Sequence, residues 1–174
     1  MNREDLISLL GSGSGLQPIN RVIRKIQNGE IELKSVVNQA ILADSVQGKN
    51  AAWTIEVLAR EKPKLIAPFL PEIIASLNDI KDFRQLAILL HLLSYFELSA
   101  EKLSAVIDLL LQCLHKKEEA EYIQYYAIQI LEMLVVDEPA FKREVLLNIE
   151  SALPLLTKDY VLNQAKKLIQ KCKK

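Results

Sequence analysis

The sequence predicts an all-α fold, a right-handed α/α superhelix of about four helix pairs with additional terminal helices. Half of the 174 residues are apolar but only 6% are aromatic, and glycine and proline occur only five and six times. Leu, Ala, Glu and Lys fill long periods of the chain, and these side chains lose little conformational freedom on entering a helix. No stretch shows the alternation typical of a strand.

The stretch from Asn50 to Asp79 is the clearest helix pair. Residues 50–61 and 63–77 form two helical runs, and the break before Pro63 separates them. Proline is well placed in the first turn of a helix, so two antiparallel helices are predicted here. The Gln47-Gly48-Lys49 segment is expected to turn the chain into this pair.

Three helices are predicted before the pair, at residues 2–10, 18–27 and 32–45. Asn2 can cap the first of them, and the Gly/Ser-rich residues 11–15 are typical of a flexible linker. The linker resembles a phosphate-binding loop only in part, because the third glycine of that motif is missing. We therefore predict a short N-terminal helix with its linker at residues 1–15 and a single repeat domain at residues 16–174.

Five helices are predicted after the pair, at residues 82–96, 99–115, 121–136, 139–154 and 158–172. Asp79 or Asp82 can start the first of these helices, and Ser99 can cap the second. A charged turn at residues 116–120 is expected to lead into the third.

A repeat emerges when the first helices of successive pairs are aligned on a small residue. These residues are Ala52, Ala87, Ala127 and Ala165, at spacings of 35, 40 and 38. An apolar residue follows each of them three positions later: Ile55, Leu90, Ile130 and Leu168. The second helices start at Pro63, Ser99 and Pro139, at spacings of 36 and 40, so both halves of the unit keep a similar period.

With this period, the sequence resembles the HEAT/armadillo class of helical repeats from about Pro18 to Cys172. The Ala-Ala-Trp segment at residues 51–53, the helix with Pro68 and Pro71, and Tyr-Ala-Ile-Gln at 126–129 are similar to a group of short bacterial HEAT-type proteins. Some members of that group carry an adenylosuccinate lyase label, but the Ser-rich catalytic loop of that enzyme family has no counterpart in this chain. The resemblance implies an α/α solenoid.

In solenoids of this class the second helices line the concave face, which predicts where a partner would bind. Equivalent outward positions, counted from Pro63, Ser99 and Pro139, carry mainly polar side chains opposite apolar faces around Ile73, Ile107 and Leu146. The predicted binding residues on this small, mildly acidic face are Glu72, Ser76, Ser104, Asp108, Gln112, Glu144 and Asn148.

These patterns predict a non-enzymatic scaffold that binds an unidentified protein or peptide. The sequence contains no Gly-x-Ser-x-Gly, His-Glu-x-x-His or Cys-x-x-Cys motif, so no catalytic residue, metal or cofactor is expected. The alternative is a nucleic-acid-binding or DNA-repair protein of the HEAT-like glycosylase kind. Balanced charge, with 22 basic and 22 acidic residues, makes nucleic acid the less favoured partner.

Trp53, the only tryptophan, lies on one helix with Glu56 and Arg60. In HEAT-like DNA glycosylases, Trp, Asp and Arg in a basic groove bind the lesion, which would support the alternative function. A packed tryptophan beside a surface Glu56–Arg60 ion pair is the favoured interpretation.

Histidine and cysteine offer no metal site. His91 lies among leucines, which favours a neutral ring with a buried hydrogen bond. Cys113 and His115 are two positions apart on a predicted helix, so their side chains point in different directions and cannot chelate one metal.

Two surface clusters each leave two interpretations open. Tyr122, Tyr125 and Tyr126, with Tyr95 and Phe96 one repeat earlier, could bind a peptide or serve packing between repeats. The lysines of residues 158–174 could contact a membrane or nucleic acid, or could complement the last helix dipole and solubilise the end of the solenoid. Packing and end-capping are favoured.

The sequence also predicts the cellular location of the protein. Residues 1–10 do not resemble a secretory signal, and the longest uncharged stretch, residues 85–96, is 12 residues long and too short to cross a bilayer. Cys113 and Cys172 are far apart and are expected to be free thiols. We expect a cytoplasmic protein without membrane contact, either a monomer or a weak oligomer.

Overall fold

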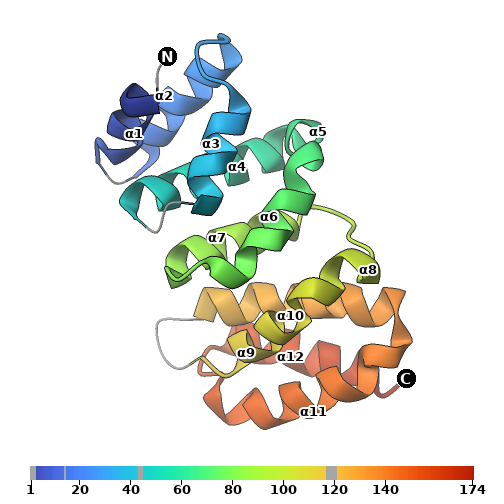
Figure 1. The fold of residues 1–174 in the computed structure, drawn as a ribbon. Coiled ribbons are helices and arrows are strands. Elements are labelled where there is room, and N and C mark those ends of the chain that lie inside the picture. The colour runs from blue at the N-terminus through green and yellow to red at the C-terminus, as the bar shows by residue number, and fades with distance from the viewer. Residues whose placement is uncertain (1–2, 14, 43–44, 117–120) are drawn as a thin grey trace. The chain divides into compact units, whose positions relative to one another are not determined.

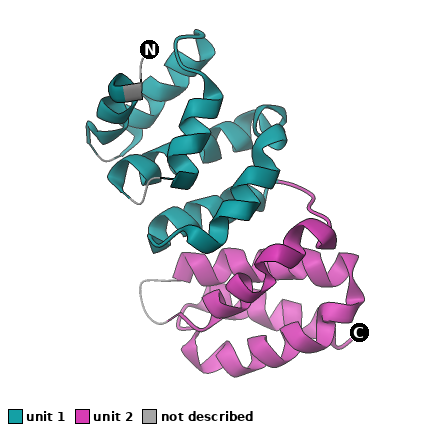
Figure 2. Ribbon diagram, in the orientation of Figure 1, with its two compact units in different colours: residues 1–95 teal, residues 96–174 magenta. Residues whose placement is uncertain are grey.

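The computed structural model describes residues 3–13, 15–42, 45–116 and 121–174, and these residues form helices and turns with no strand (Figure 1). This confirms the all-α prediction. The chain divides into two compact units, residues 1–95 and residues 96–174 (Figure 2). The boundary predicted near residue 15 lies inside unit 1 and stays a prediction.

Unit 1 is organised around α4 (Val46–Glu61), the helix that carries the Ala-Ala-Trp segment. Ten of its residues are buried, among them Ala51 and Ala52, whose small side chains let neighbouring helices approach closely. α4 packs against α1 (Arg3–Gly11), α2 (Leu16–Gln27), α3 (Leu33–Leu42) and α7 (Phe83–Leu93).

The helix predicted at residues 63–77 is interrupted, which corrects the prediction of one continuous helix. It consists of α5 (Pro63–Ile66), the 3₁₀ turn η1 (Ala67–Phe69), α6 (Leu70–Ser76) and a second 3₁₀ turn, η2 (Leu77–Asp79). Pro68 and Pro71 have no backbone N–H to donate, so the α-helical hydrogen bonds cannot continue through them.

Unit 2 is organised in the same way around α10 (Glu121–Asp137), which packs against α9 (Ile107–Leu114) and α12 (Asp159–Cys172). α11 (Lys142–Ala152) contacts α9 and α12. The helices predicted at residues 99–115 and 139–154 are also interrupted, by the short elements α8 (Ala100–Leu103), η3 (Ser104–Val106), η4 (Pro139–Phe141) and η5 (Leu153–Leu155).

The positions aligned in the sequence repeat form the cores of the units. Ile55, Leu90, Ile130 and Leu168 are all fully buried. Of the aligned alanines, three are also fully buried and only Ala87 keeps partial exposure. The alignment therefore identified inward-facing positions of successive first helices correctly.

The start of α4 differs from the sequence prediction. Gln47-Gly48-Lys49 was expected to be a turn, but it is the first turn of α4, which begins at Val46. Ser45 caps this end: its hydroxyl accepts a hydrogen bond from the Gly48 N–H at 3.3 Å. Because the Ser45 side chain stabilises the first turn, α4 can begin before Gly48.

Of the other predicted caps, Asp82 is confirmed, since its carboxylate accepts hydrogen bonds from the N–H groups of Arg84 and Gln85 at 2.8 and 3.0 Å. The Ser99 side chain makes no such bond. The Ala100 N–H instead donates to the Asp137 carboxylate at 2.7 Å, so an acidic side chain from α10 performs that role. Asn2 lies outside the described residues, as do 117–120 of the predicted charged turn.

Buried amides tie first helices to the ends of other helices. The Asn50 side-chain amide donates to the Leu10 and Gly13 carbonyls at 2.7 and 2.9 Å, and that of Gln85 to the Ala40 carbonyl at 2.9 Å. Each amide satisfies carbonyl groups that the end of a helix leaves without an intrahelical partner. Asn50 therefore attaches α1, predicted to precede a flexible linker, to the core of unit 1.

Candidate functional site

The seven predicted binding residues all lie on second helices or their 3₁₀ turns. Glu72 and Ser76 belong to α6 in unit 1, and the other five belong to η3, α9 and α11 in unit 2. Ser76 and Asn148 are half-buried, and the others are exposed: Glu72, Ser104, Asp108, Gln112 and Glu144. Of the apolar residues expected opposite them, Ile73 is fully buried whereas Ile107 and Leu146 are half-buried.

In unit 2, the other five residues lie on η3, α9 and α11, and α9 packs against α11; we call these five residues the polar α9–α11 face. Asp108 and Gln112 of α9 are four residues apart, as are Glu144 and Asn148 of α11, so each pair lies on one helix face, and Ser104 lies in the 3₁₀ turn just before α9. The Asn148 side-chain amide donates to the Glu144 carbonyl at 3.0 Å, and the Ser104 hydroxyl to the Glu101 carbonyl at 2.7 Å.

The carboxylates of Asp108 and Glu144 are the charged groups of this polar face. Within the part of the chain that the structure describes, no ion pair engages either of them. The α9–α11 face therefore offers two solvent-exposed negative charges beside amide groups that can donate and accept hydrogen bonds.

Glu72, in unit 1, has a different environment. Both of its carboxylate oxygens accept hydrogen bonds from the Lys34 ammonium group of α3, which packs against α6. Lys34 Nζ also lies 5.6 Å from the centre of the Phe69 ring. The sequence analysis did not identify Lys34, whose charge offsets the acidity predicted at Glu72.

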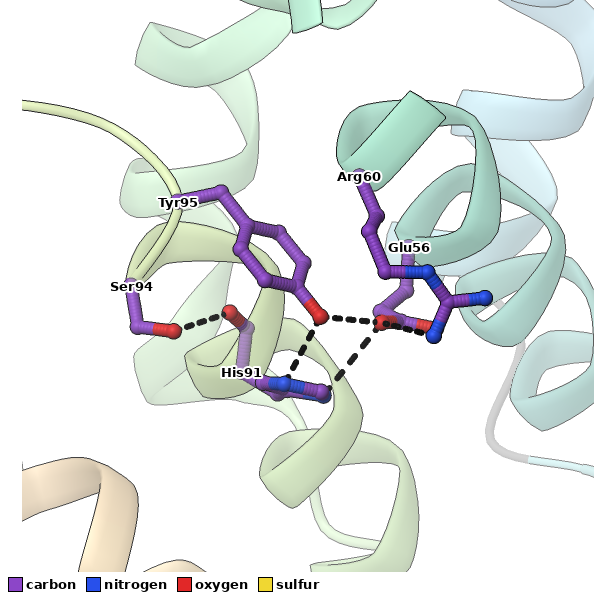
Figure 3. A network of polar contacts seen from close by, with 5 residues as sticks. All are labelled: Glu56, Arg60, His91, Ser94 and Tyr95. Carbon is purple, nitrogen blue, oxygen red and sulfur yellow. Dashed lines mark hydrogen bonds and ion pairs between the residues drawn. The ribbon is translucent and has the colours of Figure 1, made fainter. Parts of the chain in front are cut away.

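The side chains around Glu56 form a polar cluster that corrects a further prediction (Figure 3). The predicted Glu56–Arg60 ion pair is present, but Glu56 does not lie at the surface, since its side chain is only 4% exposed. The Tyr95 hydroxyl donates to Glu56 Oε1 at 2.7 Å, and His91 Nδ1 lies 3.3 Å from the same oxygen. Arg60 is farther away, at 3.9 Å, and is largely exposed. Trp53, expected to be packed, is only half-buried.

His91 is held in place from two sides. The Tyr95 hydroxyl lies 2.7 Å from His91 Nε2, and the two rings are 4.8 Å apart. Burial lowers the pKa of His91 below its ordinary value of 6.5; Glu56 opposes this shift and Arg60 adds to it. A lowered pKa agrees with the neutral ring predicted from the sequence.

We expect His91 to make the stability of the protein depend on pH. Between its lowered pKa and 6.5 the unfolded chain binds more protons than the folded one, so the free energy of unfolding falls as pH decreases through that window. Urea denaturation above and below this pH window measures the effect. The free energy of unfolding should fall less for His91→Gln than for the wild type as the pH decreases. His115→Gln, at an exposed position, is the matched control. An NMR titration that places the His91 pKa above 6.5 would contradict the expectation.

The tyrosines of the predicted aromatic cluster belong to different units. Tyr95 belongs to the Glu56 cluster, whereas Tyr122, Tyr125 and Tyr126 lie on α10. Tyr160 of α12, which the sequence analysis did not single out, contacts Tyr125 edge to face. Tyr160 follows Tyr122 by 38 residues, the same spacing as between Ala127 and Ala165, so the repeat contained the signal for it.

The cysteines and His115 show no metal-binding geometry. Cys113 is buried, which raises the pKa of its thiol to about 11, whereas His115 is exposed. Among the described residues, no group of three or more His, Cys, Asp or Glu side chains could hold a metal ion.

Three lysines on or next to the last helix form ion pairs within unit 2. Lys171 pairs with Glu132 of α10, Lys173 with Glu150 of α11 at 2.8 Å, and Lys158 with Glu121 at 3.4 Å. The end-capping role of the lysines stays a prediction. No helix among the described residues is long and apolar enough to span a membrane.

Comparison with known proteins identifies a family. The model of a family described as a HEAT repeat domain matches residues 8–171, which is most of the chain and includes all seven predicted binding residues. No curated protein and no solved structure matches the chain.

Proposed function

Because the chain belongs to the HEAT repeat family, an α/α solenoid family, we propose that it is a non-enzymatic scaffold that binds a protein or peptide. Solenoids present extended surfaces of equivalent side chains, and such surfaces suit the recognition of another polypeptide. The observation that carries the proposal is the α9–α11 face, where the exposed residues Asp108, Gln112 and Glu144 and the half-buried Asn148 lie on two helices that contact each other.

The chemistry of this face favours a partner segment with basic side chains. The exposed carboxylates of Asp108 and Glu144 attract cations, which raises association rates and excludes acidic partners. Gln112 and Asn148 can add hydrogen bonds to a peptide backbone. Glu72 contributes less in this scheme, because a partner would have to compete with Lys34 for its carboxylate.

Charge balance supports a polypeptide partner over nucleic acid. Unit 1 contains 11 basic and 10 acidic residues, and unit 2 contains 11 basic and 12 acidic residues. Binding to phosphates draws most of its affinity from a large excess of positive charge, whereas the two kinds of charge are nearly balanced in each unit. The two unpaired cysteines agree with the proposed cytoplasmic location, where thiols stay reduced.

The test is a comparison of two charge-reversed proteins. Asp108→Lys/Glu144→Lys changes the proposed face, and Glu61→Lys/Glu97→Lys changes two exposed carboxylates outside the second helices. Partners captured from a cell lysate of the source organism are quantified by mass spectrometry. We expect the first variant to lose a wild-type partner by about tenfold, which corresponds to about 1.4 kcal/mol, and the control to retain it.

Two results would overturn the proposal. One is equal recovery of every partner by the wild type and both variants. The other is salt-sensitive binding of a labelled DNA duplex at physiological salt, which would instead support the nucleic-acid function.

A further inference from the structure

A second surface in unit 2 is aromatic rather than polar. The tyrosine patch consists of Tyr122, Tyr125 and Tyr126 on α10 and Tyr160 on α12. Tyr125 and Tyr126 follow Tyr122 by three and four residues, so both lie next to Tyr122 on the same side of the helix. The Tyr125 ring contacts those of Tyr126 and Tyr160 edge to face, with centroids 5.4 Å apart in both cases.

The outer rings of the patch are accessible. Tyr122 is 58% exposed and Tyr160 is 42% exposed, whereas Tyr125 and Tyr126 are half-buried. Neighbouring positions such as Ile123, Ala127 and Val161 fill the core. Packing of the unit therefore accounts for the inner tyrosines but leaves two large rings in contact with solvent.

A carboxylate lies beside these rings. Glu121 is the first residue of α10. Burial raises the pKa of Tyr160, and the charge of Glu121 and the neighbouring tyrosines add to this shift. Lys158 Nζ lies 3.4 Å from Glu121 Oε2, longer than a good charge-assisted hydrogen bond. A carboxylate has acceptor sites on both oxygens, so Glu121 can bind a second cation.

Negative ring faces next to a carboxylate complement one kind of group, a planar cation. We propose that the tyrosine patch and Glu121 bind an arginine side chain of a partner polypeptide. The guanidinium stacks on the exposed face of Tyr122 or Tyr160 and donates hydrogen bonds to Glu121. Arginine suits this surface better than lysine, because its planar group stacks on rings and is less strongly hydrated.

This inference does not rest on the proposed function. The tyrosine patch lies on the first helices α10 and α12, whereas the proposed polar face lies on the second helices α9 and α11. Glu121 also disfavours a phosphate-bearing partner, because like charges would approach closely.

The test uses Asp108→Lys/Glu144→Lys as the parent protein, so that binding to the polar face does not contribute. The probes are two short fluorescein-labelled peptides, one alternating Gly with Arg and the other alternating Gly with Lys, and fluorescence anisotropy measures the dissociation constants. We expect the arginine peptide to bind the parent more tightly. Tyr122→Ala/Tyr160→Ala should weaken its binding by about fivefold or more, within the range of a cation–π contact.

Two control variants and one further variant distinguish ring stacking from a general loss of folding. Tyr122→Phe/Tyr160→Phe retains the ring faces and should bind the arginine peptide within about twofold of the parent, since the cation–π contact is kept. Leu147→Ala removes another exposed apolar side chain of unit 2 and should leave binding unchanged. Glu121→Gln should weaken binding while leaving the rings intact.

Equal affinity of the parent for the two peptides would overturn the inference, as would unchanged binding by the tyrosine-to-alanine variant. Tighter binding of a proline-rich peptide that lacks arginine would also overturn it, since it would show that the rings recognise apolar rather than cationic groups.

Discussion

Replacing Ile130 by alanine is expected to lower the free energy of unfolding by about 2–5 kcal/mol. Ile130 is fully buried in α10, the helix around which unit 2 is organised. Truncation removes apolar contacts with the neighbouring helices and leaves a cavity that close-packed surroundings fill only in part. Urea denaturation followed by circular dichroism measures the change.

Leu147→Ala is the matched control, since it also truncates an aliphatic side chain of unit 2. Leu147 is 61% exposed on α11, so its loss should change stability by no more than about 0.5 kcal/mol. Similar losses in the two variants would show that the repeat-aligned position is not a core position.

The sequence predicted the fold well because packing in this chain follows a period. A first helix must bury the same face in every repeat, so Ile55, Leu90 and Ile130 recur at the same place after an alanine. Helix ends were predicted less well. The true start of α4 depends on the Ser45 hydroxyl, a local hydrogen bond that hydrophobic periodicity does not report.

The polar contacts between helices were not predicted. Glu56 was assigned to the surface because Arg60, one turn away, offered an ion pair. Its burial depends on His91 and Tyr95, which follow at about one repeat length, and His91 occupies the position equivalent to Glu56 in the next first helix. The Lys34–Glu72 pair likewise joins residues 38 positions apart. Such pairs depend on how neighbouring helices pack.

The seven predicted binding residues occupy solvent-accessible positions of second helices, as the repeat alignment predicted. Exposure follows from the period, because positions opposite a buried face must point outward. Binding does not follow from it, since a polar outward position suits solvation and recognition equally. Their role in binding a partner stays a prediction that the charge-reversal experiment addresses.

Replacing Tyr95 by phenylalanine is expected to cost about 1.5–3 kcal/mol, the range for a hydrogen bond to a charged group. The substitution keeps the ring and removes only the hydroxyl, whose bond to Glu56 at 2.7 Å is the shortest contact of that carboxylate in the cluster. Glu56 is nearly inaccessible to water, so solvent cannot replace the lost donor. Arg60 is largely exposed and 3.9 Å away, and it compensates only weakly.

Denaturation of four proteins measures the coupling between the Tyr95 hydroxyl and the Glu56 carboxylate charge: the wild type, Tyr95→Phe, Glu56→Gln and the double variant. We expect an interaction energy above about 0.5 kcal/mol, because residues in one hydrogen-bonded network do not contribute additively. Tyr160→Phe, which removes a more exposed hydroxyl, should be nearly neutral. Additive effects in the four-protein comparison would show that the Glu56 carboxylate does not need the Tyr95 hydroxyl, and that its burial in unit 1 is stabilised by other contacts.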